Sequence, residues 1–179
     1  METGALSARG FAYPSQAMPS GPAMTTSGRA FAPPAFYSFC ANEPVLCGTQ
    51  GEKKLVDLTP QLHAQLERVN KSVNRRIRER ADPGNTGADK WELPATEGDC
   101  EDFAILKKAE LMKRGWPASV LLLTVATMGN EGHTVLTVRT SNGDLVLDNR
   151  VNRVKDWSST PYRYFARQSQ TDGSQWQRV

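Results

Sequence analysis

The order of the predicted elements indicates an α+β fold, with helices first and an antiparallel sheet after them. Two helical patterns cover residues 60–80 and 100–115, where apolar residues recur three and four positions apart. Apolar runs then follow at residues 119–127, 134–140 and 145–148, and runs of this length are typical of strands. At 179 residues the chain is long enough for one domain with a hydrophobic core.

The first helix has a clear start and one apolar side. Thr59 is a candidate N-cap, and Pro60 suits the first helical position because the missing N–H would have no partner there. The apolar stripe consists of Leu62, Leu66, Val69, Val73 and Ile77. The polar side carries Arg68, Lys71, Arg75, Arg76, Arg78 and Arg80. Such a basic side is most often a solvated face, and docking of an acidic partner is the alternative.

Cys100 stands at the start of the second predicted helix, between Asp99 and Glu101. Free backbone N–H groups and the positive end of the helix dipole stabilise a thiolate at such a position. A small buried cysteine is also common at a helix start, so the position alone leaves both interpretations open.

A histidine and an aspartate lie at the ends of two predicted strands. His133 opens the run of residues 133–138, and Asp148 closes the run of residues 143–148. Together with Cys100 they provide a nucleophile, a base and a residue that orients the base. This set predicts thiol acyl transfer, in which the thiolate attacks a carbonyl and the imidazolium protonates the leaving amine.

The turn between these two strands decides whether His133 and Asp148 can meet. Asn142-Gly143 is a strong signal for a two-residue turn, which would place Thr137 opposite Asp148. His133 would then lie four residues further along, roughly 13 Å away. We therefore predict a wider or bulged turn, and a regular two-residue turn would count against the triad.

Several sequence blocks occur in the same order in a known family. They are GDCEDFAILKKAELMKRG from Gly98, GHTVLTV from Gly132, GDLVLDN from Gly143 and YRYFARQS from Tyr162. From about Phe39 to about Trp176, the chain resembles the bacterial transglutaminase-like cysteine proteinases, which include the LapG-type periplasmic proteases. The resemblance implies a papain-like, transglutaminase-like core with the cysteine helix packed on the sheet. It also implies a cysteine peptidase with Cys100, His133 and Asp148 as catalytic residues.

The acidic residues beside the cysteine indicate a metal site. Asp99, Glu101 and Asp102 should raise the pKa of the Cys100 thiol, because nearby negative charges oppose its ionisation. A divalent cation would offset these charges, and closely spaced carboxylate oxygens suit calcium. The resemblance implies the same, since LapG-type proteases are calcium-dependent with the site beside the cysteine. Helix capping by one or two of these acids is the alternative.

Composition divides the chain into three parts. Residues 1–35 are rich in Ala, Gly, Pro, Ser and Thr and are predicted to be flexible, because such a segment buries little apolar surface. Residues 36–170 are the predicted transglutaminase-like domain, and residues 171–179 are predicted to form a loose tail. The net charge of +3 is too small to indicate nucleic-acid binding.

The cysteines and the resemblance bear on the compartment. Cys40 and Cys47 are close enough in sequence to close a small loop, which is expected in an oxidising compartment but not in a cytosol. The resemblance implies a periplasmic protein, although residues 1–29 contain no apolar run typical of a signal peptide. A zinc site made by Cys40, Cys47, His63 and Cys100 would match no common ligand spacing.

Three functions follow from these observations. The resemblance implies a peptidase that acts on a secreted or surface protein, such as an adhesin, and a regulatory membrane protein as a partner. A protein-glutamine acyltransferase would use the same residues with an amine in place of water. A binding module without catalysis is the third possibility, and the presence of Cys100, His133 and Asp148 argues against it.

Overall fold

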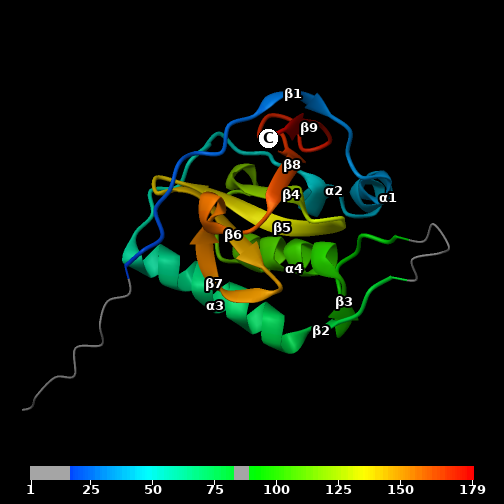
Figure 1. The fold of residues 1–179 in the computed structure, drawn as a ribbon, viewed down its shortest axis with the longest axis horizontal. Helices are drawn as coiled ribbons and strands as arrows, with labels where there is room; N and C mark the ends of the chain where they lie inside the picture. The colour runs from blue at the N-terminus through cyan, green and yellow to red at the C-terminus, as the bar shows by residue number, and fades with distance from the viewer. Residues whose placement is uncertain (1–16, 83–88) are drawn as a thin grey trace, which may run out of the picture.

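The computed structural model describes residues 17–82 and 89–179. A seven-stranded antiparallel sheet has the strand order β1-β9-β8-β4-β5-β6-β7 (Figure 1). Its strands are β1 (Ser27–Ala30), β4 (Leu121–Met128), β5 (Glu131–Thr140), β6 (Gly143–Asp148), β7 (Val151–Asp156), β8 (Arg163–Gln168) and β9 (Trp176–Arg178). The predicted α+β fold class is confirmed.

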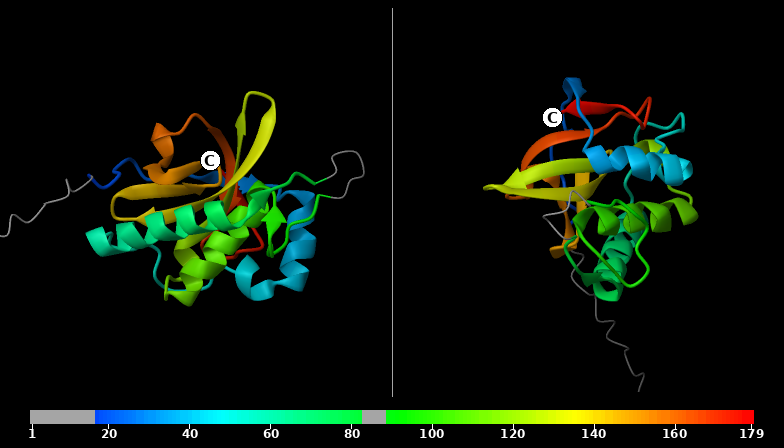
Figure 2. Two further views of the ribbon diagram at one scale, coloured as in Figure 1. Left: turned by 90° about the horizontal axis from the view of Figure 1, so that it is seen from below. Right: turned by 90° about the vertical axis from the view of Figure 1, so that its right-hand side faces the viewer.

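The helices are α1 (Pro34–Asn42), α2 (Pro44–Cys47), α3 (Pro60–Arg76) and α4 (Cys100–Lys113). The remaining elements are a parallel pair, β2 (Arg78–Glu79) with β3 (Glu97–Gly98), and two 3-10 turns, η1 (Ala118–Val120) and η2 (Trp157–Ser159). Both long helices lie on the same side of the sheet (Figure 2). No helix within residues 17–82 and 89–179 is long and apolar enough to cross a membrane.

The helix α3 begins as predicted and ends slightly earlier. The Thr59 side chain caps it by accepting a hydrogen bond from the Leu62 N–H at 3.2 Å. The helix ends at Arg76 rather than near Arg80, because the next residues turn to extended backbone. There the Arg78 N–H donates to the Thr96 carbonyl at 2.9 Å.

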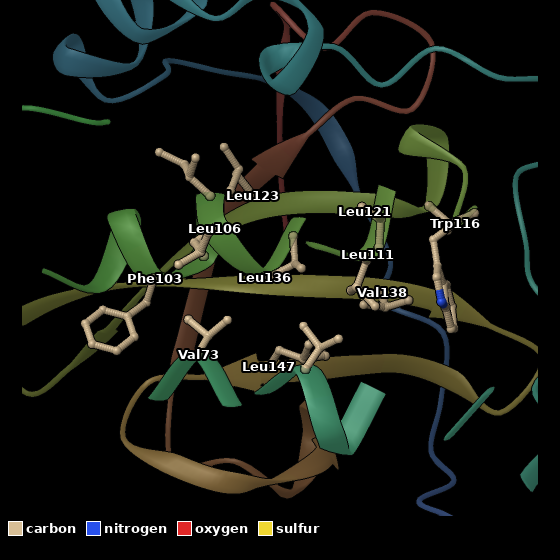
Figure 3. Packing of buried hydrophobic residues seen from close by; sticks show 14 of the residues in the cluster. Val73, Phe103, Leu106, Leu111, Trp116, Leu121, Leu123, Leu136, Val138 and Leu147 are labelled. Carbon is tan, nitrogen blue, oxygen red and sulfur yellow. The ribbon is translucent and has the colours of Figure 1, made fainter. Parts of the chain in front are cut away.

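The core fills the space between α4 and the middle of the sheet. Leu106 and Leu111 of α4 lie among leucines of β4, β5 and β6, and Phe103 belongs to the same cluster (Figure 3). Trp91 also belongs to this core, since its ring lies edge-on to Phe36 at 5.8 Å between centroids. The core therefore holds α4, and with it Cys100, in a fixed position against the sheet.

Two boundaries predicted from composition need correction. Ser27–Ala30 pairs with Trp176–Arg178, so both ends of the domain lie in the sheet rather than being loose. Upstream, the Gly21 N–H donates to the Asn142 carbonyl at 2.9 Å. Composition missed these contacts because backbone hydrogen bonds and a few buried side chains, among them Met24 and Trp176, hold segments that are otherwise polar. Residues 1–16 of the predicted flexible segment lie outside the described residues.

The predicted bulge in the β5–β6 hairpin is wrong. The register is regular from Leu136↔Leu147 to Thr140↔Gly143, with a two-residue turn one position earlier than Asn142-Gly143. Gly143 has a φ of +95°, and a Cβ there would lie 2.3 Å from the Gly21 carbonyl oxygen, so only glycine fits. If the pairing is continued by one residue pair beyond Leu136↔Leu147, Asp148 lies opposite Val135.

Candidate active site

The thiol of Cys100 lies where α4 meets β5. Cys100 is the first residue of α4, after the N-cap Asp99. Its Sγ accepts a hydrogen bond from the Thr134 N–H of β5 at 3.3 Å. The thiol also donates to Glu101 Oε2 at 3.2 Å. Since Thr134 follows His133 in the chain, the backbone of β5 brings the predicted base beside the predicted nucleophile.

His133 and Asp148 form the predicted pair. The distance from His133 Nε2 to Asp148 Oδ1 is 2.8 Å, and the two residues are 3% and 5% exposed. They meet despite the regular turn because His133 lies two residues from Val135, the residue opposite Asp148. His133 and Asp148 are therefore diagonal neighbours on one face of the sheet, and long side chains can reach each other across this distance. Within the described part of the chain, His133 Nδ1 is buried without a hydrogen-bond partner. This nitrogen is therefore available to the thiol.

The Asp148 carboxylate is fully satisfied by its neighbours. Its Oδ1 also accepts the Arg150 N–H at 3.0 Å, and its Oδ2 accepts the hydroxyl of Tyr162. Burial opposes ionisation of Asp148, but the hydrogen bonds from His133, Tyr162 and the Arg150 N–H outweigh it and lower the pKa. Asp148 is thus held as an anion that can orient His133. The contact between Tyr162 and Asp148 could not be predicted from the sequence. There, Tyr162 stands out only as the first residue of the block YRYFARQS, which resembles the family.

A second group of acids includes Glu101, which accepts the hydrogen bond of the thiol. We call it the carboxylate cluster. Its members are Asp82, Asp89, Asp99 and Glu101, and one oxygen of each lies within 4.8 Å of the others. Asp82 and Asp89 were missed because they stand upstream, on either side of residues 83–88, and only the fold brings them to the helix start.

Asp102, the third predicted metal ligand, does not belong to the carboxylate cluster. Its oxygens accept the Glu92 N–H at 2.9 Å and the Asp99 N–H at 3.3 Å. The prediction is corrected for this residue, which caps the helix as the alternative interpretation expected. Gly98 permits this close approach, since a Cβ there would lie 2.6 Å from Asp102 Oδ2.

The carboxylate cluster is poorly neutralised by the protein itself. Burial, followed by hydrogen bonds to Asp89 and Asp99, raises the pKa of Glu101 to about 10. Burial and the nearby Glu101 carboxylate also raise the pKa of the Cys100 thiol. Among the described residues, Asp99 Oδ1 is buried without a partner. Four hard oxygen donors with an unpartnered oxygen fit a divalent cation such as calcium.

Comparison with known proteins agrees with this geometry. A family model described as bacterial transglutaminase-like cysteine proteinase, BTLCP, matches residues 26–179. The chain belongs to this family. No curated protein matches the chain.

Solved structures of LapG have a similar fold. Calcium-bound LapG of Legionella pneumophila is 30% identical with a TM-score of 0.52, over 59% of this chain and 64% of LapG. EGTA-treated LapG of the same organism is 32% identical with a TM-score of 0.51, over 59% of this chain and 62% of LapG. The match therefore spans less than two thirds of the LapG chain.

The other two cysteines of this BTLCP member take no part in the site. Cys40 and Cys47 form a disulfide with their Cα atoms 5.0 Å apart, and Cys100 is free. His63 lies 3.4 Å from Glu67 on α3. The disulfide removes both sulfurs as metal ligands, so the zinc alternative fails.

Proposed function

We propose that the chain is a cysteine endopeptidase with Cys100 as nucleophile, His133 as base and Asp148 as the residue that orients the base. One observation carries this proposal, namely the buried His133–Asp148 hydrogen bond beside the thiol, with His133 Nδ1 lacking a hydrogen-bond partner among residues 17–82 and 89–179. Membership of the cysteine proteinase family supports it.

The proposed reaction begins at the Cys100 thiol. The proton of Cys100 Sγ moves to His133 Nδ1, and the thiolate attacks the peptide carbonyl. The backbone N–H of Cys100, at the first position of α4, points away from the hydrogen bonds within the helix and is the expected donor to the oxyanion. The imidazolium then protonates the leaving amine, and water hydrolyses the thioester. Asp148 holds the ring in the Nε2–H tautomer throughout.

We further propose that the carboxylate cluster binds calcium. Asp82, Asp89, Asp99 and Glu101 would hold the ion, and the calcium-bound and EGTA-treated forms of LapG support this choice. When bound, the cation would offset the negative charge beside the thiol. Asp102 stays outside the ligand set because its oxygens accept backbone N–H groups.

The proposed substrate is a secreted or surface protein, such as an adhesin, in the periplasm. The Cys40–Cys47 disulfide supports an oxidising compartment. A hollow of about 480 Å³ between α1 and residues 89–93 is lined in part by Asp89, so a peptide bound there would lie beside the carboxylate cluster. A regulatory membrane protein as partner is proposed from the family resemblance alone.

The proposal is tested by searching for new protein N-termini. A mixture of bacterial surface proteins is incubated with the chain and calcium, and new N-termini are identified by mass spectrometry. Cleavage products that are absent with Cys100→Ala are expected. Incorporation of a labelled primary amine without new N-termini would instead identify an acyltransferase. If neither product forms, the chain is a binding module.

A further inference from the structure

We propose that Tyr162 is a positioning residue that sets both the His133 ring and the Asp148 carboxylate, an inference that rests on the proposed peptidase function. The hydroxyl of Tyr162 donates to Asp148 Oδ2. Its ring lies 4.9 Å from the His133 ring, with an angle of 42° between the planes. One side chain therefore contacts both members of the pair.

The hydroxyl fixes the rotation of the carboxylate. Asp148 Oδ1 already accepts from His133 and from the Arg150 N–H, so Tyr162 supplies the donor for the second oxygen. Asp148 is 5% exposed, and an unsatisfied oxygen at such a site carries a desolvation penalty. Without the hydroxyl, the carboxylate gains by turning toward another donor or water, and this weakens its bond to His133.

Tyr162 also lies beside Asp148 at the edge of a hollow. A hollow of about 140 Å³ is lined by both Asp148 and Tyr162, together with Pro161 and the basic residues Arg153 and Lys155. Loss of the hydroxyl would let water approach Asp148 Oδ2 from this side. Exclusion of water strengthens the electrostatic interaction between Asp148 and His133.

The groups around Tyr162 keep its hydroxyl protonated, so the hydroxyl remains a hydrogen-bond donor. Burial, followed by its hydrogen bond to Asp148, raises the pKa of the Tyr162 hydroxyl. Arg150 opposes this effect, Tyr164 adds to it, and Lys107 faces Asp148 from α4. The hydroxyl thus stays protonated at neutral pH, so the contact with Asp148 persists wherever the peptidase would work.

The test compares Tyr162→Phe with Tyr164→Phe. Tyr164 belongs to the same aromatic group, but its hydroxyl bonds Thr160 rather than Asp148. In the wild type, a downfield Nε2–H proton signal of His133 that is protected from solvent exchange is expected by NMR. The sequence contains two histidines, so His63→Gln assigns the signal.

In Tyr162→Phe, the signal should broaden or exchange, and iodoacetamide should alkylate Cys100 on the order of 10-fold more slowly. Tyr164→Phe should leave both readouts unchanged, and circular dichroism checks that both variants fold. Wild-type behaviour of a folded Tyr162→Phe would overturn the inference. His133→Ala separates the two proposals: if it does not slow alkylation, the peptidase proposal fails, whatever Tyr162 does.

Discussion

Two acidic groups lie near Cys100 and His133, namely Asp148 alone and the carboxylate cluster, and they differ in how the protein neutralises their charge. Both oxygens of Asp148 accept hydrogen bonds, and these lower its pKa despite burial. In the carboxylate cluster, burial raises the pKa of Glu101 to about 10, and Asp99 Oδ1 has no partner among the described residues. The first group is complete without a ligand. The second is consistent with a site that a cation completes.

The largest expected effect comes from Asp148, whose two oxygens both accept hydrogen bonds. Asp148→Asn keeps the shape of the side chain but removes the charge that orients His133, so kcat/KM should fall on the order of 10⁴-fold. Peptide cleavage measured by mass spectrometry checks this. Asp172→Asn is the control, because the Asp172 carboxylate accepts its hydrogen bonds from the N–H and hydroxyl of Ser174 in its own loop. Activity of Asp148→Asn within a few-fold of wild type would exclude the proposed role.

A smaller effect, on calcium affinity, is expected from a change in the carboxylate cluster. Glu101→Gln removes one proposed ligand charge and should weaken calcium binding by roughly 10- to 100-fold, measured by isothermal titration calorimetry. Asp102→Asn is the matched control, because it removes a charge one residue away that caps the helix. We expect it to leave calcium affinity nearly unchanged and to lower the free energy of unfolding by about 1 kcal/mol. Equal losses of affinity in both variants would contradict the assignment of ligands.

Two buried lysines of α4, Lys107 and Lys108, also differ in whether the protein provides a hydrogen-bond partner. The Lys108 ammonium donates to the Gly48 carbonyl at 2.8 Å, whereas Lys107 Nζ has no hydrogen-bond partner in the described part of the chain. Lys107→Met should therefore raise the free energy of unfolding at pH 6 by about 1–3 kcal/mol, more than Lys108→Met does. Chemical denaturation of both variants measures the difference. A larger gain for Lys108→Met would contradict the contrast.

These lysines also predict a pH dependence of stability. Burial lowers the pKa of each from the ordinary 10.5 to about 7. Between these values the unfolded chain binds protons that the folded protein does not, so their contribution to the free energy of unfolding rises with pH from about 7 to 10.5. Below pH 7 the buried charges are destabilising. The rise should be smaller in Lys107→Met than in wild type, and an unchanged profile would show that Lys107 does not titrate this way.

The sequence was sufficient where local patterns determine structure. The cap at Thr59, the helix start at Cys100 and the strands that carry His133 and Asp148 all follow from residue order and spacing. The hairpin register did not follow, because the turn lies one residue before the Asn-Gly signal and the triad pair meets on a diagonal. Asp82, Asp89 and Tyr162 are joined to the site only through tertiary packing. No local pattern identifies such residues.

The activation of Cys100 by His133 is measured most directly by the rate at which iodoacetamide alkylates Cys100 at neutral pH. With Cys40 and Cys47 in a disulfide, each chain should take up one adduct, which intact mass spectrometry counts. In calcium we expect His133→Ala to slow alkylation at least 10-fold, an order-of-magnitude value for loss of the base. Addition of EGTA should slow the wild type as well. Equal rates for wild type and His133→Ala in calcium would show that the imidazole does not activate the thiol, and would contradict the proposed peptidase.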